Sequence, residues 1–242
     1  MYTRAMPDAS ADWVVGKHGP LEKVSENLWR VEGAVPRGPI RRVMTVARLT
    51  NGDLVIHSAI ALEESAMKEL EQLGTPRYLI VPNGFHRIDA PRFKKRYPAI
   101  RVVCPKGATK RVADAVAVDG GFELLPDDPR LRVEMLEGSG DREAVLIVKD
   151  GAETTLIFND VVFNMPHATG FGGFVLKHLT KSSGGPCVSR IARAALVKDN
   201  AKVRAHLERL AQLDGLARAI VSHHEVITGD VAAQLRAVAA TL

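Results

Sequence analysis

Apolar and polar residues alternate in the first quarter of the chain in the pattern of half-buried strands. This alternation covers residues 27–33 and 43–49, and Asn51-Gly52 is a strong signal for a tight turn into a third strand at 53–58. The chain is therefore expected to open with an antiparallel meander.

The remainder of the chain alternates between helical periodicity and short apolar runs. Helices are predicted at 62–73, 91–96, 106–115, 202–213 and 231–238. Strands are predicted at 78–81, 101–104, 122–125, 131–136, 144–148, 155–158 and 219–221. Two strand-rich blocks, each followed by helices, favour an α+β fold in which two mixed sheets pack face to face with helices outside, an αββα sandwich.

The chain of 242 residues is long enough for one large core, and no linker divides it. Residues 1–24 are polar and irregular, so we expect an N-terminal arm followed by a domain over 25–242. Within that domain, the Gly-rich stretch 164–186 is predicted to be a lid or an insertion.

Composition and charge narrow the location and the partners. No apolar run reaches the length of about 18 residues that a transmembrane helix needs, and the N-terminus lacks the apolar segment of a secretory signal, so we expect a cytoplasmic protein without membrane contact. Cys104 and Cys187 are expected to be reduced thiols. The net charge is +5, and the densest basic cluster, 92–97, is better explained as a solvated helix face than as a nucleic-acid site.

Polar side chains that can bind metal follow three of the predicted strands. They are His86, Asp160 and the pair His223-His224. Open α/β sheets bind ligands beyond the carboxyl ends of their strands. These residues are therefore expected to converge at one edge of the double sheet.

The order of the elements and of these strand-end residues resembles the metallo-β-lactamase superfamily over roughly residues 25–240. Asp160, after Ile157-Phe158-Asn159, stands where the family has its Gly-Asp bridging ligand. The segment 220–227 stands where the family has its last His turn, with His224 as the ligand.

The sequence departs from the family in its other motifs. The His-x-His-x-Asp-His motif is reduced to residues 82–89, in which His86 is the one histidine. No histidine lies in 137–141, where the middle ligand would be, and His57-Ser58-Ala59 replaces the usual Asp-x-Gly. The resemblance is thus to a degenerate branch of the superfamily.

What the resemblance implies is a reduced, mononuclear site in which His86, Asp160 and His224 are metal ligands and His86 and Asp160 are catalytic. A His₂-carboxylate set suits one Zn, Mn or Fe ion, which lowers the pKa of a coordinated water toward about 7. The expected function is a metal-dependent hydrolase, or a relic of one, acting on an ester, thioester, amide or phosphoester of a small molecule.

The alternative is a non-catalytic protein that has kept the sandwich and lost the metal. His86 would then cap the following helix, Asp160 would form an Asx turn, and His223-His224 would be a buried pair. Its pocket beneath 164–186 would bind a small molecule or a partner chain, and the pattern leaves a homo-oligomer open. A third interpretation, nucleic-acid processing through 92–96, is disfavoured by the spread of the basic residues.

A second metal would need further ligands, and the nearby candidates are His57, Asp89, His167 and His223. None of them lies in a recognisable pattern, so a second metal is disfavoured and these residues have no assigned role. His57 and Ser58 are adjacent on a strand, so they point to opposite faces and cannot form a nucleophile–base dyad. We expect one of them to hydrogen-bond toward the site. His206 is predicted to face solvent on the polar side of helix 202–213.

Overall fold

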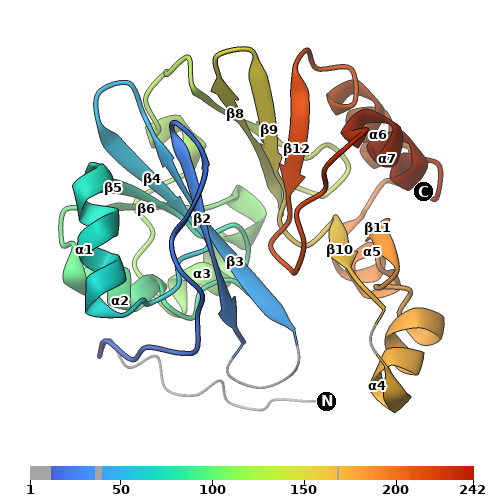
Figure 1. The fold of residues 1–242 in the computed structure, drawn as a ribbon, viewed down its shortest axis with the longest axis horizontal. Coiled ribbons are helices and arrows are strands. Elements are labelled where there is room, and N and C mark those ends of the chain that lie inside the picture. Colours follow the sequence, from blue (N-terminus) through green and yellow to red (C-terminus); the bar gives the residue numbers. More distant parts are fainter. Residues whose placement is uncertain (1–11, 36–39, 168) are drawn as a thin grey trace.

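Two β-sheets lie against one another at the centre of the molecule, and helices cover their outer faces (Figure 1). The structure is a computed structural model and describes residues 12–35, 40–167 and 169–242. Residues 1–11 of the predicted N-terminal arm lie outside the described residues. In the described part of that arm, the Trp13 indole N–H donates to the carbonyl of Leu62 at 2.9 Å.

The first sheet has six strands in the order β1-β2-β3-β4-β5-β6. These are β1 (Glu22–Ser25), β2 (Leu28–Ala34), β3 (Arg41–Arg48), β4 (Asp53–His57), β5 (Thr75–Ile80) and β6 (Arg101–Val103). The first four form the expected antiparallel meander, whereas β4, β5 and β6 are parallel. Its outer face packs on α1 (Glu64–Leu73), α2 (Ala90–Arg96), the 3-10 turn η1 (Lys106–Ala108) and α3 (Thr109–Ala113).

The second sheet has the strand order β12-β9-β8-β7. These are β7 (Leu131–Met135), β8 (Ala144–Asp150), β9 (Glu153–Ile157) and β12 (Leu216–Ile220). Only the β12–β9 pair is parallel in this sheet, so both strands end at the same edge. The outer face packs on α5 (Arg190–Leu196), α6 (Asn200–Leu210) and α7 (Val231–Ala239), the last two lying together on the right of Figure 1.

Strand periodicity explains how each sheet is buried on both sides. Leu54, Ile56 and Leu79 face the helices of the first layer. Their neighbours Val55 and Ile80 face the second sheet, in one cluster with residues of β8, β9 and β12. Because successive side chains of a strand point to opposite faces, this arrangement yields two helix–sheet cores and one sheet–sheet core. The predicted αββα sandwich is confirmed.

The stretch between β9 and α5 has its own small elements. β10 (Phe163–Met165) pairs with β11 (Gly185–Cys187) in an antiparallel ladder, and α4 (Gly170–Phe174) and a π-helical turn η3 (Val175–Leu179) lie between them. The predicted lid or insertion, 164–186, lies wholly within this stretch. None of the helices in the described part of the chain has the length and apolarity to span a bilayer.

Sequence and structure differ at one predicted strand. Residues 122–125 contain a 3-10 turn, η2 (Phe122–Leu124), which ends where Leu125 returns to an extended conformation. Apolar spacing alone does not distinguish a strand from such a turn, because Phe122 and Leu124 both pack on the sheet–sheet core. The two cysteines are free, Cys104 buried and Cys187 partly buried.

Candidate functional site

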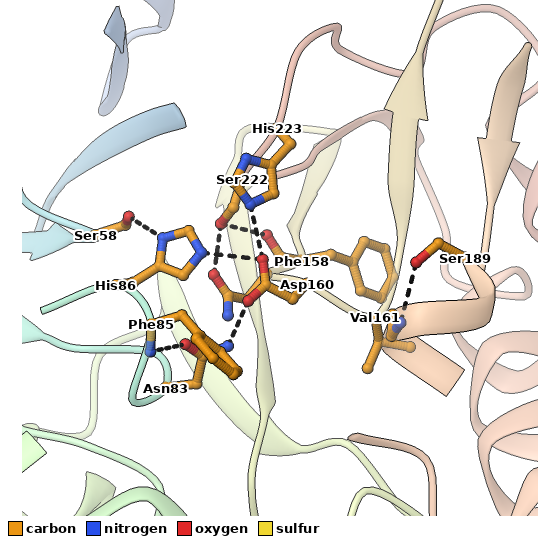
Figure 2. A network of polar contacts seen from close by, with 12 residues as sticks. Ser58, Asn83, Phe85, His86, Phe158, Asp160, Val161, Ser189, Ser222 and His223 are labelled. Atoms are coloured by element: carbon orange, nitrogen blue, oxygen red, sulfur yellow. Dashed lines mark hydrogen bonds and ion pairs between the residues drawn. The ribbon is translucent and has the colours of Figure 1, made fainter. Parts of the chain in front are cut away.

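Three loops that follow strands β5, β9 and β12 bring polar side chains together. His86 Nε2 lies 3.0 Å and His223 Nε2 lies 2.9 Å from the same oxygen, Asp160 Oδ1 (Figure 2). One ligand atom from each of the three residues lies within 4.8 Å of the others. We call His86, Asp160 and His223 the trio. Within the described part of the chain, it is the one such group of three or more His, Cys, Asp or Glu residues.

Local hydrogen bonds shape the loop that carries His86. Asn83 Oδ1 accepts the N–H of Phe85 at 2.8 Å, an Asx turn that redirects the chain after β5. Asp89 closes the same loop, because its buried carboxylate contacts Arg42 of β3 and Arg92 of α2 at 2.5 Å each. Asp89 is therefore committed to two ion pairs that tie this loop to the first sheet.

His223 is oriented by a backbone carbonyl of the other sheet. Its Nδ1 lies 2.7 Å from the oxygen of Arg41, and because a carbonyl can only accept, Nδ1 must donate. The ring also stacks on Phe163 of β10, with centroids 5.0 Å apart and planes at 20°. Burial acts to lower the pKa of His223, but hydrogen bonding to the Asp160 carboxylate and its charge outweigh burial and raise it.

Asp160 is the centre of the network. Oδ1 faces the two imidazoles, and Oδ2 accepts from Asn83 Nδ2 at 2.7 Å. Burial acts to raise its pKa, but His86 and His223 together hold the pKa of this carboxyl well below its usual value. Asp160 is therefore an ionised carboxylate, which is the form that binds a cation.

Ser58 supports His86 from the end of β4. Its Oγ lies 2.8 Å from His86 Nδ1, and its φ of +58° places it in the left-handed region that a serine seldom adopts. Ser58, His86 and Asp160 thus stand in the order of a serine-hydrolase triad. Ser58 is only 2% exposed, so its hydroxyl has no open side for an acyl group. The expectation that one residue of the His57-Ser58 pair hydrogen-bonds toward the site is confirmed.

His57 points into the interior beside this network. It is 2% exposed, and neither ring nitrogen has a hydrogen-bond partner among the described residues. Burial, with a smaller contribution from His86, lowers the pKa of His57 to about 3. His57 is therefore a neutral imidazole and not a member of the trio.

His224, the predicted third ligand, is not in the trio, and its neighbour His223 occupies that place. The different placement of the two neighbouring histidines has a backbone cause. His224 adopts φ of +67°, and its backbone bridges to Asn164 of β10. This left-handed residue interrupts the alternation of side chains, so adjacent histidines take unrelated directions. His224 Nε2 is buried with no partner in the described structure, and burial, then the charge of His223, lowers its pKa.

Two other histidines make local contacts. His167 Nδ1 lies 3.1 Å from Ser183 Oγ, so it joins the two ends of the 164–186 stretch. His206, predicted to face solvent, is 2% exposed, and the prediction is wrong. Its Nδ1 accepts the N–H of Glu137 at 3.1 Å, because α6 packs that side of the ring onto the loop after β7.

Glu143 is a functional candidate that sequence reasoning does not identify. It lies directly before β8, is 1% exposed and makes hydrogen bonds with Asn83, Asn159 and the backbone of Asp160 and Val161. Burial and then the charge of Asp160 raise its pKa to about 8, against the opposing effect of these N–H donors. The one feature of the sequence that could have indicated Glu143 is its position, as an acidic residue immediately before the uninterrupted apolar run 144–148.

Solved structures identify the architecture. The chain matches the DIM-1 metallo-β-lactamase exposed to ceftazidime with a TM-score of 0.62 at 12% identity, over 94% of this chain and 99% of that one. A metallo-β-lactamase from Pontibacter korlensis matches with a TM-score of 0.60 at 11% identity, over 92% and 99%. The mono-zinc form of FIM-1 from Pseudomonas aeruginosa matches with a TM-score of 0.61 at 8% identity, over 96% and 98%. This chain has the metallo-β-lactamase fold.

No family model and no curated protein matches the sequence. At identities of 8–12% the structural likeness shows the fold alone. A metallo-β-lactamase fold positions a site but does not define its chemistry. Function has to be argued from the trio and its surroundings.

Proposed function

We propose that this protein is a metal-dependent hydrolase of the metallo-β-lactamase superfamily with a mononuclear site formed by His86, Asp160 and His223. One observation carries the proposal: two imidazole nitrogens and one ionised carboxylate oxygen converge within 4.8 Å at the strand ends of this fold. His₂-carboxylate sets with an open position suit zinc, manganese or iron.

The donor atoms fit such a cation after a small adjustment. A tetrahedral zinc site with bonds of about 2.0–2.1 Å separates its ligand atoms by about 3.4 Å. The two Nε2···Oδ1 separations are 3.0 and 2.9 Å, so each imidazole has to move by about half an ångström, which is within side-chain freedom. The protons that now join these atoms would leave as the cation enters.

One contact favours one ion over two. A second ion at this carboxylate would need Asp160 Oδ2, and that oxygen already accepts from Asn83 Nδ2 at 2.7 Å. Asn83 belongs to the reduced first motif, where the family has histidines. Its amide N–H therefore occupies the direction in which a second cation would approach.

The residues of the site have separable roles in this proposal. His86, Asp160 and His223 hold the ion, which supplies Lewis-acid activation of water when bound. Ser58 and the Arg41 carbonyl hold the two imidazole rings. The substrate class proposed is a small molecule with an ester, thioester, amide or phosphoester bond.

The stretch 164–186 is proposed to cover the ligand. Its first strand touches the site, because Phe163 of β10 stacks on His223 and the Asn164 carbonyl accepts the N–H of Glu225. We also propose a cytoplasmic location, which the two free thiols support.

A paired substitution tests the metal site. Zinc, manganese and iron content is measured on protein purified without a His tag, for the wild type, His223→Ala and His224→Ala. We expect about one equivalent of metal in the wild type and in His224→Ala, and a loss of affinity of at least about 100-fold in His223→Ala. Metal-free wild type after zinc titration, or equal affinity in both variants, would refute the proposal.

The second candidate is a non-catalytic binding protein, and one feature favours it. The trio makes a complete set of hydrogen bonds to protein atoms, and its side chains are only 6%, 9% and 13% exposed. A panel of ester, thioester, amide and phosphoester substrates, assayed with zinc and with manganese, separates the two functions. Turnover that is lost in His223→Ala and kept in His224→Ala excludes the binding protein.

A further inference from the structure

Glu143 joins two of the strand ends that build the trio. It is 1% exposed and directly precedes β8, the strand that pairs with β9. Its Oε1 accepts from Asn83 Nδ2, Asn159 Nδ2 and the Asp160 N–H, each at 3.1 Å. Its Oε2 accepts the N–H of Val161 at 3.0 Å. One buried carboxylate thus collects four N–H donors from the loops after β5 and β9.

All four partners are N–H donors, so both oxygens of Glu143 act as acceptors in these contacts. Ionisation of Glu143 is costly, because a buried charge loses its hydration and would lie beside a second carboxylate, Asp160, and both effects raise its pKa. No cation pairs with Glu143 in the described structure. Features that break the ordinary rules of burial concentrate at functional sites.

The contacts of Glu143 determine where the Asp160 carboxylate points. The bonds from the Asp160 and Val161 N–H groups hold the backbone on both sides of that side chain. Asn83 Nδ2 then connects Glu143 Oε1 with Asp160 Oδ2, which sets the rotation of the Asp160 carboxylate. The Asn83 amide cannot flip, because its Oδ1 is held by the Phe85 N–H. Only Oδ1 of Asp160 is left to face the two imidazoles.

We propose that Glu143 is a positioning residue for the candidate metal site: through Asn83 and the backbone of Asp160, it holds Asp160 Oδ1 between His86 and His223. The importance of this placement for metal binding rests on the proposed function. The placement itself is a property of the metal-free protein and is tested without metal.

The test compares Glu143→Gln with Glu134→Gln. Glutamine keeps the size of Glu143 but replaces one acceptor oxygen by an NH₂ donor. That donor would face the N–H groups that the oxygen now accepts from, and those hydrogen bonds would be lost. Glu134 is the control, because it lies on β7, pairs with Val145 of β8 and makes its ion pairs with Arg132 and Arg209, outside the trio. NMR on metal-free protein follows the Nε2–H protons of His86 and His223, and zinc titration follows affinity.

We expect Glu143→Gln to shift or broaden away both Nε2–H signals and to weaken zinc binding 10- to 100-fold, with neither effect in Glu134→Gln. Unchanged signals in a folded Glu143→Gln protein would overturn the proposal, as would the same zinc loss in the control. If Glu143→Gln does not fold, Asn83→Ala decides. It removes the link from Glu143 to Asp160 Oδ2 and also the Asx turn before His86, so the deciding signal is the Nε2–H of His223, which should shift and whose unchanged position would overturn the proposal. Shifted signals in a protein that binds no zinc would keep the positioning role and reject the metal-site function.

Discussion

Replacing His223 by alanine in the metal-free protein should remove the stabilising contacts that the trio makes without a cation. The bond to ionised Asp160 at 2.9 Å is charge-assisted and contributes about 1.5–3 kcal/mol. The bond to the Arg41 carbonyl at 2.7 Å contributes about 1 kcal/mol. Stacking on Phe163 contributes a further amount of about 0.5–1.5 kcal/mol. We expect a loss of about 3–5 kcal/mol, which is also the usual cost of removing one partner of a buried ion pair.

The loss should depend on pH with a defined sign. Asp160 raises the pKa of His223 in the folded protein, so the pair is fully stabilising below the unfolded pKa of about 6.5. As pH rises through the higher folded pKa, the imidazolium loses its proton and the contribution falls. The difference in unfolding free energy between wild type and His223→Ala should therefore shrink from pH 6 toward alkaline pH.

Urea unfolding in the presence of a chelator, at several pH values, measures this difference. His224→Ala is the control and should cost about 1 kcal/mol or less, because that ring makes no comparable hydrogen bond. Equal losses for the two variants would refute the account of the network. So would a difference for His223→Ala that grows as pH rises.

Three further predictions concern residues around the site and in the fold. His57→Leu should be neutral or stabilising at pH 7, because it removes two buried unpartnered nitrogens. It should also reduce the loss of stability in acid between the unfolded pKa of His57, about 6.5, and its folded pKa of about 3. Urea denaturation of both proteins at pH 4 and pH 7 measures these effects. Zinc at 100 times its dissociation constant should stabilise the wild type by about 2.7 kcal/mol but leave Asp160→Asn unchanged, as thermal shift would show. Gly215→Ala should lower the melting temperature sharply, because φ is +67° and a Cβ would lie 1.8 Å from the Ala152 carbonyl oxygen.

The double-sheet architecture follows from the sequence because apolar runs and turn signals are local properties. The Asn51-Gly52 turn, the meander and the main amphipathic helices lie where the pattern places them. So does the convergence of residues 86 and 160, since both follow strands that end at one edge. These features depend on period and order along the chain, which a single sequence displays directly.

The membership of the trio was less predictable, because it depends on backbone conformation at single residues. Nothing in Ser222-His223-His224 shows that His224 takes a left-handed conformation while His223 meets the Arg41 carbonyl. Glu143 is a similar case, since its four donors come from loops far away in sequence. The pattern of apolar residues also mispredicts His206, because it assigns every polar residue of a helix to the exposed face. It does not show that the loop after β7 covers this one.

The two imidazoles of the trio are held by partners of different kinds, and this difference bears on the proposed metal site. Arg41 offers His223 a carbonyl, which keeps a proton on Nδ1, so Nε2 is the nitrogen that donates to Asp160 and that would be freed when its proton leaves. Ser58 offers His86 a hydroxyl, which can donate to Nδ1 or accept from it. In the proposed metal site, the tautomer of His223 is therefore set in advance, whereas that of His86 can adjust when the protons leave. Hydrogen bonds from Arg41, Ser58 and Asn83 thus hold all three side chains of the trio in place without a cation.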